Sequence, residues 1–206
     1  MRFLRLLTVS LMLCVPAITL GALNARAQGG GGGRGGGQGG APAAKPLTLT
    51  VEGFADGTDI PAKYTQAGDQ TSPKISWINT PAGTVTFVLN VHDIDNSHNH
   101  TTDDQAHWVV WNIPGTATGL PEGVPKGDKL DNGASQTSAN GASYRGPGAP
   151  ANGPKHHYVF DLYALDTKLD IQAGADGFET RTIVMKAMQG HIIGKAAYVG
   201  LFRRPQ

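Results

Sequence analysis

Two stretches of the chain carry side chains that can hold a small anion or move a proton. The first begins at His92-Asp93-Ile94-Asp95 and runs through a polar loop to His107. The second begins at residues 144–150, Tyr-Arg-Gly-Pro-Gly-Ala-Pro, and is closed by His156 and Tyr158. Imidazole and phenol groups donate hydrogen bonds to phosphate or carboxylate, and an imidazole or carboxylate can also act as a general base on bound water. Neither stretch holds a serine or cysteine in an elbow motif, so no nucleophile is evident.

The first stretch lies where a predicted strand meets a loop. Residues 84–91 alternate between apolar and polar side chains, which is typical of a half-buried strand. If this strand continues, Asp93 points to the side that is apolar earlier in the strand. A buried carboxylate needs a partner, and His107, at the start of the next strand, is the nearest candidate in the sequence. The alternative is an aspartate that only caps the end of the strand.

The loop over residues 93–104 also suggests a metal site, since it contains spaced aspartates and histidines. An EF-hand is excluded because His98 occupies the position that requires glycine, and because strands rather than helices flank the loop. His92, His98 and His100 are transition-metal ligands in principle, but no spacing among them is diagnostic. We therefore predict neither a metal nor another cofactor.

The second stretch combines glycine amides with donor side chains. Gly146 and Gly148 offer backbone N–H groups with no Cβ in front of them, whereas the neighbouring prolines have no N–H to give. Glycine-rich backbone concavities bind anions, although many such loops are only turns. His156 and Tyr158 follow on one face of the next predicted strand. Together these groups predict a small anion pocket.

The rest of the chain predicts a mainly β domain. Alternating patterns indicate further strands at residues 47–52, 107–113, 156–163 and 195–203, separated by Gly/Pro/Asn/Asp turns, which is typical of a sandwich or barrel. One helix is expected at about residues 177–189. It would start at a capping box formed by Asp176 and Glu179 and stop at Gly190.

Residues 1–27 are predicted to form a signal peptide. Two arginines precede an apolar run over residues 6–23, and Ala25-Arg26-Ala27 matches a cleavage signature. A membrane anchor is the alternative, and it is disfavoured because a proline and a glycine interrupt the run. We expect a periplasmic or secreted protein that retains no membrane span after cleavage near Ala27.

The remaining chain divides into a glycine-rich flexible linker at residues 28–46 and one domain at residues 47–206. Cys14 is the single cysteine, so the cleaved protein has no disulfide. The signal carries three of the 17 basic residues, which leaves 14 basic and 16 acidic residues and a net charge of −2. Nucleic-acid binding, which needs a basic surplus or stripe, is therefore not expected.

Both stretches resemble the motifs of the phosphatidylethanolamine-binding protein family, in its bacterial Raf-kinase-inhibitor-like (YbhB/YbcL) branch. Residues 93–97 and His107-Trp108 correspond to an Asp-Pro-Asp-Ala-Pro run followed by a histidine before an aromatic strand. Residues 146–150 and 156–160 correspond to a Gly-x-Gly-Pro-Pro loop that ends in His-Arg-Tyr-Val-Phe. The resemblance extends from about Leu47 to Arg203.

This resemblance implies a β-sandwich with one or few peripheral helices and a small pocket for phosphate-type anions. By position, the pocket residues are Asp93, Asp95, His107, Gly146, Gly148, His156 and Tyr158. Three features depart from the family pattern: Ile94 replaces a proline, Asn96-Ser97 replaces Ala-Pro, and His157 replaces an arginine. Kinase inhibition, known for eukaryotic members, is not carried over to an exported protein.

We therefore expect an exported binding protein, not an enzyme, whose ligand is phosphate, a phosphorylated headgroup or a carboxylate. Two other classes stay open at this point. One is a hydrolase that uses a histidine or carboxylate as general base on bound water. The other is a regulator that binds a protein partner, which the sequence does not identify.

Overall fold

The computed structural model describes residues 44–206, which form two sheets and one α-helix. The predicted signal peptide and most of the predicted linker lie outside the described residues, and the proposed domain boundaries stay predictions. The smaller sheet has the order β1-β3-β6. Its strands are β1 (Thr48–Val51), β3 (Ile75–Ile78) and β6 (Gly119–Leu120).

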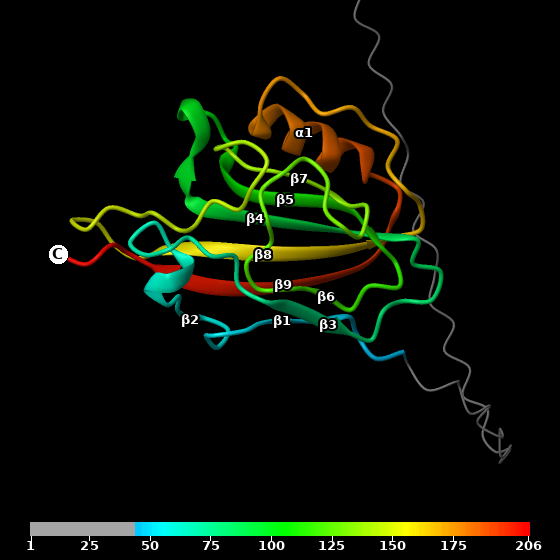
Figure 1. Cartoon of the computed structure of the whole chain (residues 1–206), viewed down its shortest axis with the longest axis horizontal. Helices are drawn as coiled ribbons and strands as arrows, with labels where there is room; N and C mark the ends of the chain where they lie inside the picture. The colour runs from blue at the N-terminus through cyan, green and yellow to red at the C-terminus, as the bar shows by residue number, and fades with distance from the viewer. Residues whose placement is uncertain (1–43) are drawn as a thin grey trace, which may run out of the picture. The chain divides into compact units, whose positions relative to one another are not determined.

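The larger sheet has six strands in the order β2-β9-β8-β4-β5-β7. Its strands are β2 (Thr58–Asp59), β4 (Thr86–Ser97), β5 (Asp104–Pro114), β7 (Ser135–Thr137), β8 (His156–Leu165) and β9 (Ile192–Phe202). All neighbours are antiparallel except β2 and β9, which are parallel. The four long strands β9, β8, β4 and β5 run side by side through the domain (Figure 1).

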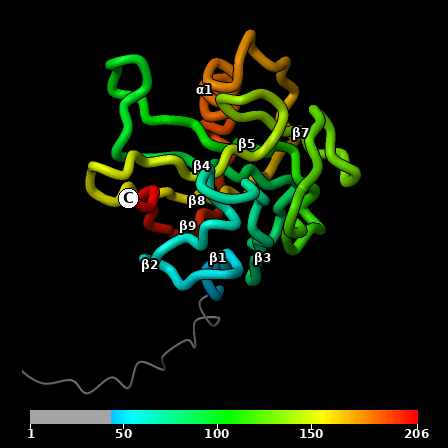
Figure 2. Tube along the Cα trace, turned by 60° about the vertical axis from the view of Figure 1, so that its left-hand side comes forward, coloured from blue at the N-terminus to red at the C-terminus, as the bar shows by residue number. Residues whose placement is uncertain are grey.

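The smaller sheet lies against one side of the larger sheet (Figure 2), and the main core is built from buried side chains of both sheets. It includes Leu49, Trp77, Phe87, Leu89, Val91, Trp108, Phe160 and Leu162, all buried. The predicted alternation is confirmed here, because Phe87, Leu89 and Val91 all face this core. Burial of such a face is the main stabilising contribution in a domain that has no disulfide among its described residues.

The other face of the larger sheet is covered by α1 (Gly177–Ala187) (Figure 1). Val184 and Met188 pack there against Val88, Val109 and Trp111. The predicted Asp176 cap is confirmed, since Asp176 Oδ1 accepts a hydrogen bond from Glu179 N at 2.8 Å. The Glu179 side chain accepts from Ala175 N at 2.6 Å, one residue before the N–H that a capping box would use.

The molecule is therefore a β-sandwich with one peripheral α-helix, as predicted. Strands β4, β5, β8 and β9 are longer than the alternating patterns indicated, whereas β1 is shorter. The central strand β4 is buried on both faces over Thr86–Asp93, so its alternation marks only the face toward the main core. Two 3-10 turns, at Ala62–Tyr64 and His98–His100, complete the described elements. Within residues 44–206, no helix is long and apolar enough to cross a bilayer.

Candidate functional site

At one end of the larger sheet, β4 ends and β8 begins near the C-terminus (Figure 1). Residues from both strands line a small pocket there. Its volume is about 210 Å³. The loop that precedes β8 closes one side, and β4 and β5 supply the floor. The lining residues are Gln66, Asp93, Asn96, Gln105, His107, Arg145, Gly148, Ala149, Pro150, His156 and Tyr158.

Asp93 lies at the bottom of this pocket and is held by a histidine. The predicted orientation is confirmed, because Asp93 shares the face of β4 that is apolar earlier in the strand and is 2% exposed. The expected partner was wrong, since His156 Nδ1, not His107, lies 2.8 Å from Asp93 Oδ2. His156 reaches it because β8 pairs with β4 and places Tyr158 opposite Asp93. The other carboxylate oxygen accepts from Asp95 N at 3.1 Å.

His107 is clamped to the loop residue Arg145 by two hydrogen bonds. His107 Nδ1 lies 3.0 Å from the Arg145 carbonyl oxygen, and Arg145 N donates to the His107 carbonyl oxygen at 3.1 Å. The ring also meets the Tyr158 ring edge-on at 5.1 Å between centroids. Burial of His107, which is 3% exposed, lowers its pKa to about 4, and the nearby Arg145 charge acts in the same direction.

Tyr158 supports the loop from below. Its hydroxyl oxygen accepts hydrogen bonds from Gly148 N at 3.1 Å and Ala149 N at 3.0 Å. The expectation that the Gly148 amide is free for a ligand was therefore wrong, because the phenol already takes it. Burial raises the pKa of Tyr158, and the Asp93 carboxylate raises it further, so the phenol stays neutral.

The two predicted glycines are needed for close packing. Gly146 does not line the pocket, and a Cβ there would lie 2.7 Å from the Tyr64 carbonyl oxygen. A Cβ on Gly148 would collide with the side chain of Gln66. Gln66 Nε2 in turn donates to the Gly146 carbonyl oxygen at 2.8 Å. The glycines therefore allow the loop to pack against residues 64–66, which fixes one wall of the pocket.

Asp95 lies outside the pocket lining, unlike the other predicted aspartate. Its carboxylate accepts from His157 N at 2.6 Å and lies 2.8 Å from His157 Nδ1. Partial burial by itself would raise the pKa of Asp95, but the hydrogen bonds from His157 outweigh it and lower the pKa. Asp95, two residues after Asp93 in β4, therefore orders the start of β8.

Arg145 is the most informative lining residue that the sequence reasoning did not select. Its Nε is buried and has no hydrogen-bond partner within residues 44–206. A guanidinium normally forks onto an anion with several donors. The available signal was its position immediately before Gly146-Pro147-Gly148. Gln66, Asn96 and Gln105 were also missed, and no local pattern distinguished them from ordinary polar loop residues.

A partly buried network of charges lies on the opposite face of the same strands. His92 Nδ1 lies 2.6 Å from Asp104 Oδ2, and His92 Nε2 lies 3.4 Å from Asp161 Oδ2. Arg181 of α1 pairs with Asp104 at 2.6 Å, and Lys195 of β9 pairs with Asp161 at 3.1 Å. Burial alone would lower the pKa of His92, but its hydrogen bonds to the two carboxylates raise it.

This arrangement separates the three histidines that suggested a metal site. His92 belongs to the buried network, whereas the ring of His98 stacks on Phe178 of α1 with centroids 3.7 Å apart. His100 is exposed in the intervening turn. Among the described residues, no group of three or more His, Cys, Asp and Glu is placed to hold a metal ion.

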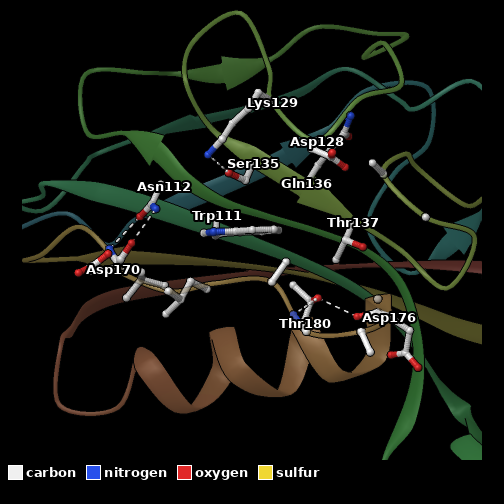
Figure 3. Close-up of a pocket in the computed structure, with 18 of the residues that line it drawn as sticks. Trp111, Asn112, Asp128, Lys129, Ser135, Gln136, Thr137, Asp170, Asp176 and Thr180 are labelled. Atoms are coloured by element: carbon white, nitrogen blue, oxygen red, sulfur yellow. Dashed lines mark hydrogen bonds between the residues drawn. The ribbon is translucent and has the colours of Figure 1, made fainter.

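A second, larger cavity of about 590 Å³ lies beside α1 (Figure 3). Trp111 lies between the strands and the helix there, and its side chain belongs to the second hydrophobic cluster. Several of the polar groups drawn are hydrogen-bonded to one another (Figure 3). Asn112 exchanges two hydrogen bonds with the Leu169 backbone, and Lys129 donates to Ser135 at 2.7 Å. None of the seven predicted site residues lines this cavity, so the smaller pocket is the candidate site.

The chain is similar to proteins of one known family. The family model described as phosphatidylethanolamine-binding protein matches residues 50–203. A UPF0098 protein of Methanothermobacter thermautotrophicus is 38% identical over 160 residues, which cover 77% of this chain and 99% of the relative. The putative lipoprotein LppC of Mycobacterium tuberculosis is 34% identical over 164 residues, covering 79% of this chain and 75% of the relative.

A solved structure shows the same fold. The crystal structure of Escherichia coli YbcL, described as a new member of the mammalian PEBP family, superposes with a TM-score of 0.66. The two chains are 25% identical, and the match covers 78% of this chain and 99% of YbcL.

Proposed function

Given that this chain belongs to the phosphatidylethanolamine-binding protein family, in its YbhB/YbcL type, we propose that it is an exported protein that binds a small anion. The ligand class is phosphate, a phosphorylated headgroup or a carboxylate. The observation that carries this proposal is the buried, unpartnered Nε of Arg145 beside His156 in one pocket.

The charges in the pocket favour an anion despite the presence of Asp93. This carboxylate is engaged by His156 Nδ1 and the Asp95 amide, so it orients the histidine and does not stand free. The Nε2 edge of His156 is then left for a ligand. A ring nitrogen that carries a proton donates to an anion oxygen. Arg145, which also lines the pocket, supplies a permanent positive charge.

The size of the pocket limits what it takes. Pockets for drug-sized ligands measure roughly 300–1,000 Å³, whereas this one measures about 210 Å³. A phosphate or a phosphorylated headgroup fits this volume, and the acyl chains of a lipid do not. The ligand is therefore either a free small anion or the headgroup end of a larger molecule that stays outside.

Binding is favoured over catalysis by the residues that line the pocket. They include no serine, threonine, cysteine or lysine, which are four of the residue types that act as covalent nucleophiles. The aspartate, histidines and tyrosine that are present hold one another or the loop through hydrogen bonds. The Asp93–His156 pair has the geometry of a general base with its orienting carboxylate. Hydrolysis of a bound ester by activated water is therefore the second candidate, and it is tested by the same ligands.

Export is proposed from two observations. Residues 1–27 have the features of a signal peptide, and a relative that is 34% identical is named a putative lipoprotein. N-terminal sequencing of the protein from its native host should give a first residue at Gln28. A chain that retains Met1 in the cytoplasmic fraction would contradict export.

Titration calorimetry with phosphate, O-phosphoethanolamine and acetate tests the binding function. We expect one site, with His156→Ala weakening phosphate binding by about 1.5–3 kcal/mol, which is the scale of a hydrogen bond to a charged group. His191→Ala is the matched control, because His191 is an exposed histidine that pairs only with Asp166. Release of alcohol from phosphate esters in the same samples would show hydrolysis, and absence of binding to all three anions would refute the proposal.

A further inference from the structure

The hydrogen bond between His107 and Arg145 fixes which nitrogen of the imidazole carries a proton. A carbonyl oxygen only accepts hydrogen bonds, so His107 Nδ1, 3.0 Å from the Arg145 oxygen, must be the donor. In a neutral imidazole the other nitrogen, Nε2, is then an acceptor. The second hydrogen bond, from Arg145 N to the His107 carbonyl oxygen, holds the two residues in this relation.

His107 is also held in its neutral form. Its burial lowers the pKa to about 4, so the ring is uncharged near neutral pH. Within residues 44–206, Nε2 has no hydrogen-bond partner. It is also not one of the fully buried polar atoms that lack a partner, so it is open to the pocket. The residue lines the pocket. The Nε2 lone pair therefore faces the space that a ligand would occupy.

We propose that this lone pair makes the pocket select oxyanions that carry a proton, namely hydrogen phosphate and the monoanions of phosphate monoesters and phosphonates, over sulfate and sulfonates of the same shape. This selectivity rests on the proposed anion-binding function. The ligand O–H donates to His107 Nε2, while its other oxygens accept from Arg145 and His156. An anion without a proton places an oxygen lone pair against the nitrogen lone pair.

The expected ratio of affinities follows from the proton that His107 has to gain before it can donate a hydrogen bond to a sulfate or sulfonate. A sulfonate accepts a hydrogen bond from Nε2 only if His107 becomes an imidazolium. With a pKa of about 4, adding that proton at about pH 6 costs two pH units, which is about 100-fold in affinity. Specificity of this kind comes from leaving a buried polar group unpaired in the wrong complex.

Other charged groups face the same space and do not explain the difference. Asp93, Arg145 and His156 line the pocket and act on any ligand through its charge. Tyr158 lies below His107 and stays neutral. Two ligands of equal charge and shape therefore isolate the proton. Two groups are possible acceptors besides His107: the Asp93 carboxylate, and His156 Nε2 when that ring is neutral with Nδ1 donating to Asp93. The test therefore has to separate both from His107.

Methylphosphonate and methanesulfonate are the matched probes. Phosphate monoesters lose their second proton at about pH 6, and phosphonates hold it more tightly, so near that pH methylphosphonate is mainly a monoanion with one O–H. Methanesulfonate is a monoanion with none. Calorimetry on the full chain at about pH 6 should show methylphosphonate binding about 100-fold more tightly. A ratio under about three-fold would overturn the proposal.

Two variants assign the selectivity to its residue. His107→Asn keeps a group near the Arg145 carbonyl but can turn an N–H toward the ligand, so the ratio should collapse to within a few-fold. His156→Asn should weaken both ligands and leave the ratio unchanged. A ratio that persists in His107→Asn would place the acceptor on another group, such as Asp93, and contradict the proposal. If the unchanged protein binds neither phosphate nor methylphosphonate, the anion-binding function itself is refuted.

A measurement on the unchanged protein avoids the risk that His107→Asn fails to fold. In ¹⁵N-labelled protein at about pH 6, the two ring nitrogens of His107 should show the shifts of a protonated Nδ1 and an unprotonated Nε2. An imidazolium, or a proton on Nε2, would overturn the proposal without any variant.

Discussion

The burial of His107 makes the stability of the fold depend on pH in a defined direction. The folded state disfavours the charged imidazole, so its pKa falls from 6.5 to about 4. Between these values the unfolded chain binds a proton that the folded protein does not, so stability is lost as pH falls through this window. The contribution is complete above pH 6.5 and levels off below about pH 4.

The magnitude follows from the difference of about 2.5 pH units, each worth about 1.4 kcal/mol, which gives about 3 kcal/mol. Solvent screening reduces this free-energy contribution little, because His107 is only 3% exposed. His92 acts in the opposite direction. Its pKa is raised, so its contribution is present below pH 6.5 and is lost as pH rises through the folded value. The total curve therefore mixes both histidines.

Urea denaturation of the unchanged protein and of His107→Asn, at intervals from about pH 7 to about pH 4, separates the two effects. His92 and all carboxylates are present in both proteins, so the difference between their unfolding free energies reports His107. We expect the advantage of the unchanged protein to shrink by about 3 kcal/mol across this range. A difference that stays constant with pH would show that His107 titrates normally and would refute the reasoning.

Four further predictions concern the supporting structure. Arg181→Met should lower the free energy of unfolding by about 2–4 kcal/mol, because the partly buried Asp104 loses its cation. Lys186→Met, at an exposed position on the same helix, is the control and should change the unfolding free energy by less than about 0.5 kcal/mol in the same urea melts. Trp111→Ala should cost about 3–5 kcal/mol, since its side chain fills the space between sheet and helix; a loss under about 1 kcal/mol would contradict this packing. Gly146→Ala should weaken phosphate binding in calorimetry, because the new Cβ displaces the loop, and unchanged affinity would show that the loop yields. Asp93→Asn should also weaken binding although it removes a negative charge, and tighter binding would show that repulsion dominates.

Local sequence patterns predicted the parts of the fold that depend on neighbouring residues. The alternation of Phe87, Leu89 and Val91 indicated a strand with one face in the core, and that face also placed Asp93 correctly. The Asp176 cap fixed the start of α1. The very short strands β2 and β6 have no pattern of their own, because two residues define no period.

The partners within the site could not be predicted, because they depend on which strands become neighbours. β8 lies beside β4, which brings His156 to Asp93, 63 residues away in the sequence. A register shift between Asp93 and Ser97 separates the end of β4 from its regular pairing, and Asp95 turns to His157 instead of the pocket. The phenol that takes the Gly148 amide likewise follows from tertiary packing alone.

The most direct test of the anion pocket is a crystal structure of the protein with O-phosphoethanolamine. The account predicts phosphate density in the pocket of about 210 Å³, with oxygens within hydrogen-bond distance of Arg145, His156 Nε2 and His107 Nε2. Density for the ligand only in the cavity beside α1, or a pocket that holds water alone at saturating ligand, would contradict it.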